Sequence, residues 1–239
     1  MYVVTVVALL SGLAAGAAAR PLIFARAVPS GEPNRRTCPS CDADYLSPGL
    51  RVRLRATTGR CPSCKAKAGP AAWLPELLTG ATFAALAATG ATGWIGAAQY
   101  WLLACGATLA LIDLAVHRLP NVLTLPASAG TILLINGAAL AGESGSLWRA
   151  LAGAAAVTAV YLFTRAGGGD IKLAPAVGAL LGWSSWTAVL WGTIAGFFLG
   201  AASGLTLMLL GRATRKTELA FGPYMILGAL TVSAFSKGA

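Results

Sequence analysis

The stretch LAPAVGALLGWSSWTAVLWGTIAGFFLGAASGLTLMLLG, residues 173–211, contains no charged residue. A transmembrane helix needs about 20 consecutive apolar residues, so this stretch is long enough for two. The stretch therefore predicts two helices that cross a membrane one after the other. The turn between them is expected at one of the small residues Gly182, Ser184, Ser185 or Gly192.

The rest of the chain has the same apolar character. Hydrophobic residues make up 56% of the 239 residues and charged residues only 11%, whereas a soluble domain carries about 25% charged residues. A soluble fold could not cover its surface with so few charges. The sequence predicts an all-α integral membrane protein with about eight transmembrane helices. The expected spans are residues 1–19, 76–92, 95–112, 122–141, 148–164, 173–190, 192–211 and 219–236.

The basic residues predict the orientation of these spans. Residues 20–72 contain ten of the 18 Lys and Arg. On the other side of the membrane only Arg149 and the terminal Lys237 are basic. Cytoplasmic connections carry an excess of Lys and Arg, so the first, third, fifth and seventh connections are expected in the cytoplasm. Six further basic residues lie in the three later connections of that set, 113–121, 165–172 and 212–218.

The net charge of +10 could also indicate a nucleic-acid partner. However, the basic residues cluster between apolar runs, and this arrangement fits membrane topology and contact with anionic lipid better. We therefore expect no nucleic-acid partner, and a multi-pass membrane protein.

Residues 1–19 are apolar, with small residues near Ala19, and could be a secretory signal peptide. The segment has no basic region before it, and Arg20 and Arg26 follow it. This charge order favours an uncleaved first transmembrane helix whose following loop lies in the cytoplasm. The expected domains are that helix at residues 1–19, a basic loop at residues 20–75, and a seven-helix membrane domain at residues 76–239.

The basic loop contains two identical cysteine turns, Cys38-Pro39-Ser40-Cys41 and Cys61-Pro62-Ser63-Cys64. Two CxxC turns can present four thiolates to one tetrahedral Zn(II), so the pattern predicts a structural zinc site. Tyr45 and the alternating residues 51–55 resemble the hairpin of a zinc ribbon. A disulfide or redox role is the alternative, and a reducing cytoplasm disfavours it. Cys105 lies in an apolar span and is expected to be a small core residue.

Asp113 and Asp170 are the only aspartates beyond the cysteine loop. Each is expected at the cytoplasmic end of a span, so both lie at one membrane depth. An ionisable group in a membrane is costly and usually functional. Two nearby carboxyl groups can share one proton, so that one group activates water while the other polarises a carbonyl. The pair therefore suits general acid–base hydrolysis, for which Asp113 and Asp170 are the candidate catalytic residues.

Each aspartate also has a simpler structural interpretation. Asp113 could be an interfacial carboxylate paired with Arg118, and Asp170 could be the N-cap of the sixth helix. His117, the only histidine, is expected to be an interfacial residue. The other carboxylates outside the basic loop also have simple expected roles, with Glu76 and Glu218 as charges at helix N-termini and Glu143 as a solvated group on the outer side.

Gly167-Gly168-Gly169-Asp170 matches the GxGD motif of membrane aspartyl proteases, and the surrounding sequence resembles the prepilin peptidases, or type IV leader peptidases. The paired CPSC turns also occur in many members of that family. The resemblance covers roughly residues 36–236. Its other motifs follow one another in the family's order, as Leu74-Pro75-Glu76-Leu77-Leu78-Thr79-Gly80, Ile112-Asp113-Leu114, residues 119–126, residues 169–173 and Phe221-Gly222-Pro223-Tyr224.

The resemblance implies an endopeptidase that cleaves the short basic leader from prepilins or pseudopilins. Cleavage would fall on the cytoplasmic side, just before the hydrophobic helix of the substrate. Residues 76–239 would then form a membrane aspartyl protease domain with Asp113 and Asp170 as its catalytic pair. Motif residues expected to support the site are Gly167, Gly169, Lys172, Pro120 and Asn121.

Many members of this family also methylate the new N-terminus with S-adenosylmethionine. Such members usually carry a Gly-Ser-Phe-x-Asn-Val type motif after the first span. The corresponding part of this chain, residues 19–29, does not contain that motif. The sequence therefore leaves a methyltransferase activity open.

Two other classes of function use the same residues. An ion- or proton-coupled transporter could use the two aspartates, although transporter sites usually lie near the bilayer midplane. A non-catalytic assembly factor could recruit partners through its zinc loop. Peptide cleavage, ion flux in sealed vesicles, and partner binding by the loop distinguish the three classes.

Overall fold

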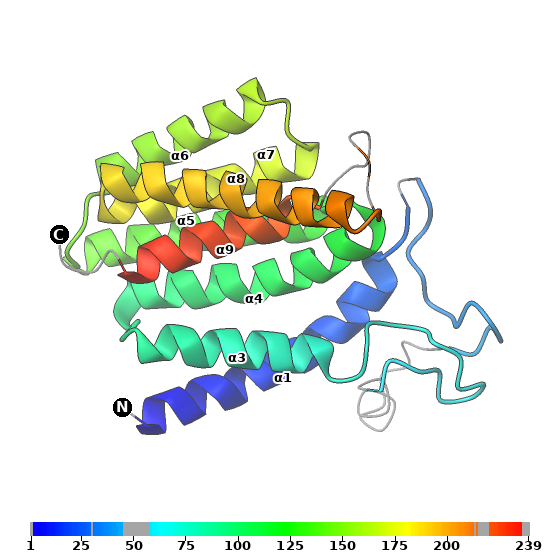
Figure 1. Ribbon diagram of the computed structural model, residues 1–239. Coiled ribbons are helices and arrows are strands. Elements are labelled where there is room, and N and C mark those ends of the chain that lie inside the picture. Colours follow the sequence, from blue (N-terminus) through cyan, green and yellow to red (C-terminus); the bar gives the residue numbers. More distant parts are fainter. Residues whose placement is uncertain (1, 30, 45–57, 213, 215–219, 236–239) are drawn as a thin grey trace.

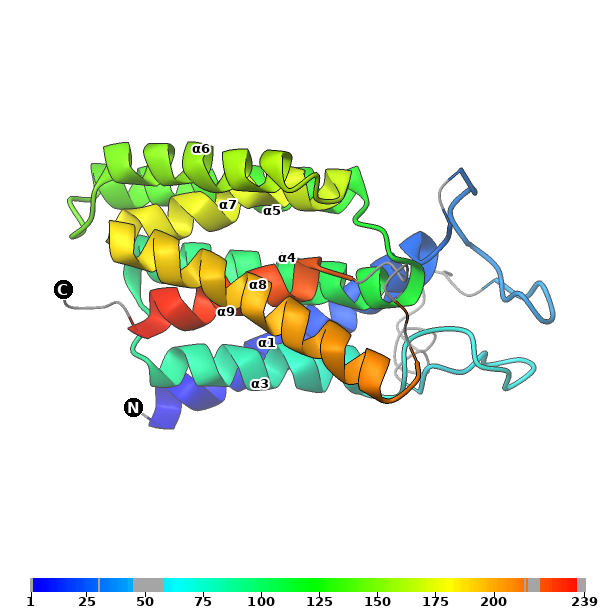
Figure 2. The same cartoon turned by 45° about the horizontal axis from the view of Figure 1, so that its top comes forward.

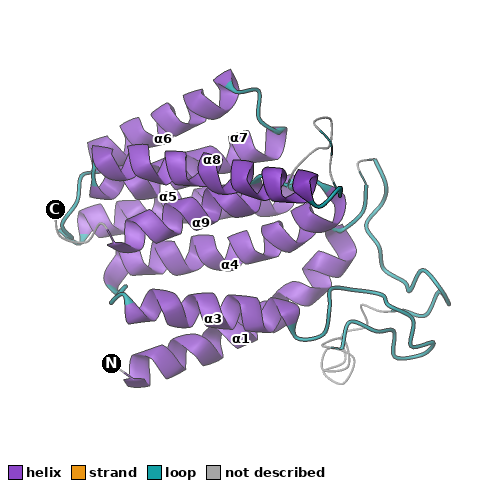
Figure 3. Ribbon diagram, in the orientation of Figure 1, coloured by secondary structure: helices purple, strands orange, loops and turns teal. Residues whose placement is uncertain are grey.

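The computed structural model describes residues 2–29, 31–44, 58–212, 214 and 220–235. Within these residues the chain forms helices and loops but no strand (Figures 1 and 3), as the sequence predicted. The expected hairpin with Tyr45 and residues 51–55 lies outside the described residues, as does Glu218. The helices are α1 (Tyr2–Arg26), α3 (Leu74–Ala88), α4 (Gly93–Val116), α5 (Asn121–Leu140), α6 (Leu147–Phe163), α7 (Gly168–Ser184), α8 (Trp186–Leu209) and α9 (Gly222–Phe235).

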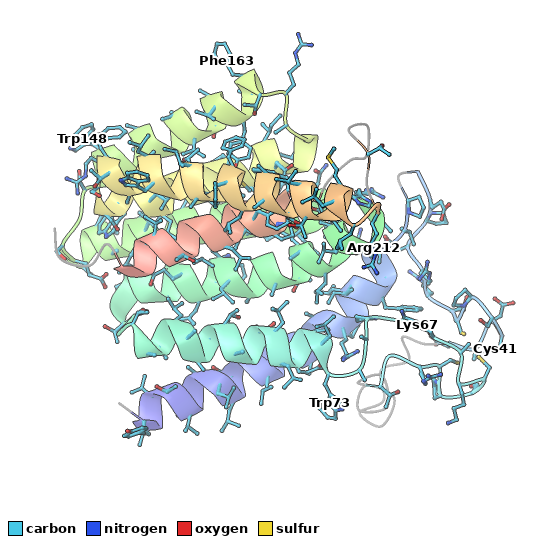
Figure 4. The ribbon with its side chains drawn as sticks, in the orientation of Figure 1. Cys41, Lys67, Trp73, Trp148, Phe163 and Arg212 are labelled. Carbon is cyan, nitrogen blue, oxygen red and sulfur yellow. The ribbon has the colours of Figure 1, made fainter. Side chains whose placement is uncertain are left out.

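The helices run back and forth in one bundle, and the cysteine loop extends from one end of it (Figure 1). We call this end the loop end. By length and composition α1, α4, α5 and α8 can each cross a membrane, whereas α3, α6 and α9 are shorter apolar helices. Large apolar side chains cover the outside of the bundle, and Figure 4 shows Trp148 and Phe163 pointing away from it. Such a surface suits contact with lipid.

The long uncharged stretch is divided into two helices, as expected. Ser185 has an extended backbone between α7 and α8. Its hydroxyl accepts a hydrogen bond of 3.0 Å from the N–H of Ala188. Ser185 is therefore the N-cap of α8, since a capping side chain satisfies an N–H group that the first helical turn leaves free.

Glycines allow neighbouring helices to approach closely. A Cβ atom on Gly178 of α7 would lie 2.3 Å from the carbonyl oxygen of Gly153 on α6. A Cβ atom on Gly16 of α1 would lie 2.4 Å from the carbonyl oxygen of Pro75 on α3. Figures 1 and 2 both show α6 alongside α7. Small residues at such contacts let helix backbones pack tightly, which stabilises helix pairs in membranes.

A buried ion pair connects α1 and α3, and the sequence analysis did not predict it. Arg20 binds both carboxylate oxygens of Glu76, and both side chains are buried. Arg20 also donates hydrogen bonds to the carbonyls of Pro70 and Ala71, at 3.3 and 3.1 Å. Glu76 does lie in the first turn of α3, as expected. Arg20 therefore holds α1, α3 and the end of the cysteine loop together.

Replacement of Arg20 by methionine is expected to lower the stability of the bundle by about 3–5 kcal/mol, because it leaves the carboxylate of Glu76 buried without its partner. The double variant R20M/E76L should regain most of this loss, since an apolar pair of similar size avoids the buried charge. Thermal unfolding in detergent measures both effects. Arg26→Met, at the end of the same helix, is the control. Wild-type stability of Arg20→Met would contradict the prediction.

Two charged side chains close helix ends opposite the loop end. The carboxylate of Glu143 accepts hydrogen bonds from the N–H groups of Trp94 and Ile95 in the first turn of α4, at 2.6 and 3.1 Å. The expectation that Glu143 is simply solvated is therefore wrong. Arg149 donates to the carbonyls of Trp183 and Ser184 at the end of α7, at 3.2 and 2.9 Å. Both contacts satisfy backbone groups that helix ends leave unpaired.

Candidate functional site

Asp113 lies in the last turn of α4, at the loop end. The helix ends three residues later, at Val116. Its C-cap His117 adopts the left-handed conformation, and the N–H of His117 donates to the carbonyl of Asp113 at 2.7 Å. The Asp113 side chain is only 5% exposed. Its carboxylate interacts with the backbone N–H of Gly222, the first residue of α9. The ends of α4 and α9 therefore position Asp113 together.

Asp170 lies in the first turn of α7, also at the loop end. The N-cap of this helix is Gly167, so Asp170 is the third helical residue and not the N-cap that the structural interpretation expected. Its side chain is 8% exposed. A Cβ atom on Gly167 would lie 3.2 Å from Oδ2 of Asp170. The glycines before Asp170 therefore leave room beside its carboxylate.

The bundle brings the two aspartates close enough to interact electrostatically. Leu119 lies between the start of α7, which carries Asp170, and the start of α9, which contacts Asp113, since its side chain approaches Gly169 and Gly222. Among the residues that the structure describes, Oδ2 of Asp113 and Oδ1 of Asp170 are buried without a hydrogen-bond partner. A buried polar atom without a partner is rare and often marks a functional site. Each carboxyl group therefore has one oxygen that is available to exchange a proton with a molecule bound at the site.

The basic residues near the pair have other partners. Arg118 donates to the carbonyl of Pro29 at 3.1 Å, so the structure does not show the expected pairing of Arg118 with Asp113. Lys172 donates to Oδ1 of Asn121 at 2.7 Å. This bond ties the starts of α5 and α7 together and joins two of the expected supporting residues. Asn121 directly follows Pro120, and Lys172 is two residues after Asp170.

Three aromatic rings form a cluster near Asp170, and the sequence analysis singled out only one of them, Phe221, as part of a motif. Tyr161 of α6 is buried and interacts electrostatically with Asp170. Its ring centroid lies 5.5 Å from that of Phe197 and 5.7 Å from that of Phe221. Phe221 directly precedes Gly222, so this cluster also adjoins the segment whose N–H interacts with Asp113. The three residues lie on α6, on α8 and before α9, and nothing in the sequence signals that these segments meet.

The four cysteines of the loop converge on one point. Their sulfur atoms all lie within 4.8 Å of one another, and the Cys38–Cys64 and Cys41–Cys61 sulfur pairs are each 3.7 Å apart. Tetrahedral zinc with Zn–S bonds of about 2.3 Å requires sulfur atoms about 3.8 Å apart. The cluster therefore has the geometry to bind one zinc ion. Figure 4 shows Cys41 far outside the helical bundle.

The two cysteine turns have the same local structure. The N–H of Cys38 donates to the carbonyl of Ala43, and the N–H of Cys61 donates to that of Ala66, each at 2.9 Å. Antiparallel bridges close both turns, Thr37 with Asp44 and Arg60 with Lys67. The backbone N–H of Cys64 lowers the pKa of the Cys61 thiol to about 6, since it stabilises the thiolate. The repeated turn is thus a preformed ligand arrangement.

Known proteins resemble this chain in sequence. Residues 100–210 match the type IV leader peptidase family. The prepilin leader peptidase/N-methyltransferase of Aeromonas hydrophila is 35% identical over 178 residues, which are 71% of this chain and 60% of that protein. The protein of the same name from Neisseria gonorrhoeae is 31% identical over 234 residues, or 87% of this chain and 75% of that protein. No solved structure matches the chain at a significant level.

Proposed function

The chain belongs to the type IV leader peptidase family, and we propose that it is a membrane aspartic endopeptidase that removes the leader from type IV prepilins or pseudopilins. The chain spans 60% of the length of its Aeromonas hydrophila relative. Its activity, substrates and partners are therefore proposals. The observation that carries the proposal is the pair of buried carboxyl groups, Asp113 and Asp170, at one end of the bundle.

The proposed chemistry needs no group beyond the two aspartates and water. One carboxylate removes a proton from water, which attacks the carbonyl carbon of the scissile peptide bond. The other carboxyl group, which holds the shared proton, donates a hydrogen bond to the carbonyl oxygen and later protonates the leaving amine. Gly167 gives room for the substrate beside the carboxylate of Asp170, and Gly169 allows the start of α7 to pack against Leu119. Lys172, Asn121 and Pro120 hold the starts of α5 and α7 in place.

We propose that the loop end, with the active site, faces the cytoplasm of the cell and that the protein lies in the bacterial inner membrane. The basic residues support this orientation, because ten of the 18 Lys and Arg lie in residues 20–72. Cleavage at the cytoplasmic surface of the membrane would leave the leader in the cytoplasm and the apolar helix of the substrate in the membrane.

Zinc and S-adenosylmethionine have different support as cofactors. We propose that Cys38, Cys41, Cys61 and Cys64 hold a structural zinc ion, which uses all four ligands and leaves no open position for catalysis. The names of the relatives include an N-methyltransferase activity, which would need S-adenosylmethionine as methyl donor. Residues 19–29 lack the family's usual motif, so peptidase activity is the primary proposal.

The test is to reconstitute the purified protein in liposomes with candidate prepilins and to measure the mass of the mature product. A product shortened at the leader boundary supports the peptidase, and a further increase of about 14 Da, the mass that one methyl group adds, reports methylation when S-adenosylmethionine is supplied. Absence of cleavage with every prepilin and pseudopilin, together with ion flux in sealed vesicles, would favour the transporter instead.

Gly169 and Gly168 provide a matched pair of variants within the GxGD motif. A Cβ atom on Gly169 would lie 2.4 Å from Cβ of Leu119, whereas a Cβ atom on Gly168 would meet nothing within 4 Å. Gly169→Ala is therefore expected to displace Asp170 or Leu119 and to reduce cleavage by about 10–100-fold, because small displacements of catalytic groups reduce rates strongly. Gly168→Ala should cleave at the wild-type rate. Equal rates for the two variants in a liposome assay would contradict this interpretation.

A further inference from the structure

Three helices of the bundle, α3, α4 and α9, enclose a groove of about 550 Å³. In Figure 1 these helices lie side by side below α8. One face of α4 lines the groove with residues spaced by four, three and four positions, and this spacing follows a single helical face. These residues are Leu103, Ala107, Ala110 and Leu114.

The facing side of α3 has the same spacing. It contributes Leu78, Thr82, Ala85 and Thr89. The hydroxyl of Thr82 donates to the carbonyl of Leu78 within its own helix, at 2.7 Å, and the hydroxyl of Thr89 is likewise bonded within α3. Their polar groups are thus satisfied, and the wall is apolar. Eleven residues of helix are about 16 Å long, so the groove runs for three helical turns along the bundle.

The groove reaches residues that neighbour Asp113, although neither aspartate lines it. Leu114 directly follows Asp113 in α4. Pro223, which lines the groove from α9, directly follows Gly222, whose N–H interacts with the Asp113 carboxylate. A second hollow, of about 610 Å³, lies at the opposite end of α4 and is lined by Val4, Tyr100 and Trp101. Of these two hollows, the first is therefore the one with lining residues next to Asp113 in the chain.

We propose that the groove between α3, α4 and α9 binds the apolar helix of the substrate, in the segment that follows the scissile bond. This inference rests on the proposed peptidase function. A helix lying in the groove would place its N-terminal end beside Asp113 and would continue along α4 toward Leu103. Ala85, Ala107 and Ala110 allow its backbone to come close, since small residues permit tight helix contacts in membranes.

A matched pair of variants on α4 tests the proposal. Ala110→Trp fills this groove, and Ala104→Trp fills the second hollow, where Ala104 is similarly half-buried. Each variant is assayed in liposomes with a full-length prepilin and with a short peptide that contains the cleavage site but lacks the apolar helix. We expect Ala110→Trp to lower kcat/KM for the prepilin about tenfold or more through KM. The short peptide should be cleaved as by the wild type, and Ala104→Trp should change neither substrate.

Two kinetic outcomes would overturn the proposal. Ala110→Trp could cleave the prepilin like the wild type, or it could lose both substrates equally, which would place its effect in the catalytic centre. If the wild type cleaves neither substrate, the proposed function itself fails.

A second measurement does not depend on cleavage. A photoreactive residue at position 107 in the Asp113→Asn variant should crosslink to the apolar helix of the prepilin. Crosslinks to lipid alone, in the presence of prepilin, would reject the groove as the binding site of the helix. A photoreactive residue at position 104 is the control and should not crosslink to the prepilin.

Discussion

Replacement of Asp113 or Asp170 by asparagine is expected to abolish leader cleavage, with a loss of at least about 10²–10⁴-fold, the usual contribution of a general acid or base. The amide can neither take a proton from water nor give one to the leaving amine. Because the two groups act as one pair, the double variant should be no slower than either single variant. Mass spectrometry of a reconstituted prepilin measures the remaining cleavage.

The control for this experiment is the same chemical change at another aspartate. Asp42 is exposed, and its backbone has a φ angle of 52°, a conformation that asparagine also adopts readily. Asp42→Asn should therefore cleave at the wild-type rate. Both catalytic variants should remain in the membrane at the wild-type level and unfold at similar temperatures. Cleavage at the wild-type rate by either of them would refute the assignment of the pair.

Replacement of two of the four cysteine ligands is expected to remove the bound metal completely, an effect as large as the loss of cleavage in the aspartate variants. The purified protein should contain one zinc ion per chain, and Cys38→Ser with Cys61→Ser should contain none. Structural zinc sites contribute about 10–16 kcal/mol in zinc-finger peptides, so the cysteine loop should lose its structure and become sensitive to protease. The helical bundle should keep most of its helix content, because its main core is separate from the loop cluster, which contacts the bundle through Phe24 near the end of α1.

Cys105 gives the control for the metal experiment. It is half-buried in α4, and burial in apolar surroundings explains its presence without a metal. Cys105→Ser should therefore retain one zinc ion. Elemental analysis gives the metal content, and titration of free thiols should find four more after a chelator is added. Five free thiols in the untreated wild type, with no bound metal, would reject the zinc site.

The helices could be predicted from the sequence because their signal is local. The apolar runs found every described helix, and Ser185 divides the long run as expected. However, α1 extends seven residues past its expected end, and α7 and α8 begin five and six residues before their expected starts. The boundaries near the site were less accurate, because α4 and α7 both extend past the predicted spans to include Asp113 and Asp170. Polar residues at a helix end weaken the hydropathy signal there, but they can still complete helical turns when they are buried by neighbouring helices.

The contacts between distant polar residues could not be predicted. Arg20 appeared as one of many basic residues at a membrane border, yet it is buried against Glu76. Glu143 appeared to be a surface carboxylate, yet it binds the start of α4. Both partners lie about 50 residues away in the chain, and only the packing of helices decides which side chains meet. The aspartate pair was found because both residues have a family motif, a signal that Tyr161 lacks.

The contact between Gly222 and Asp113 has a consequence for biosynthesis. A nascent chain enters the membrane from its N-terminus, so Asp113 and Asp170 are both inserted before α9 leaves the ribosome. Until then Asp113 lacks the backbone N–H of Gly222, and α9 does not yet cover the site. The proposed catalytic pair would therefore be complete only once α9 has packed against the end of α4.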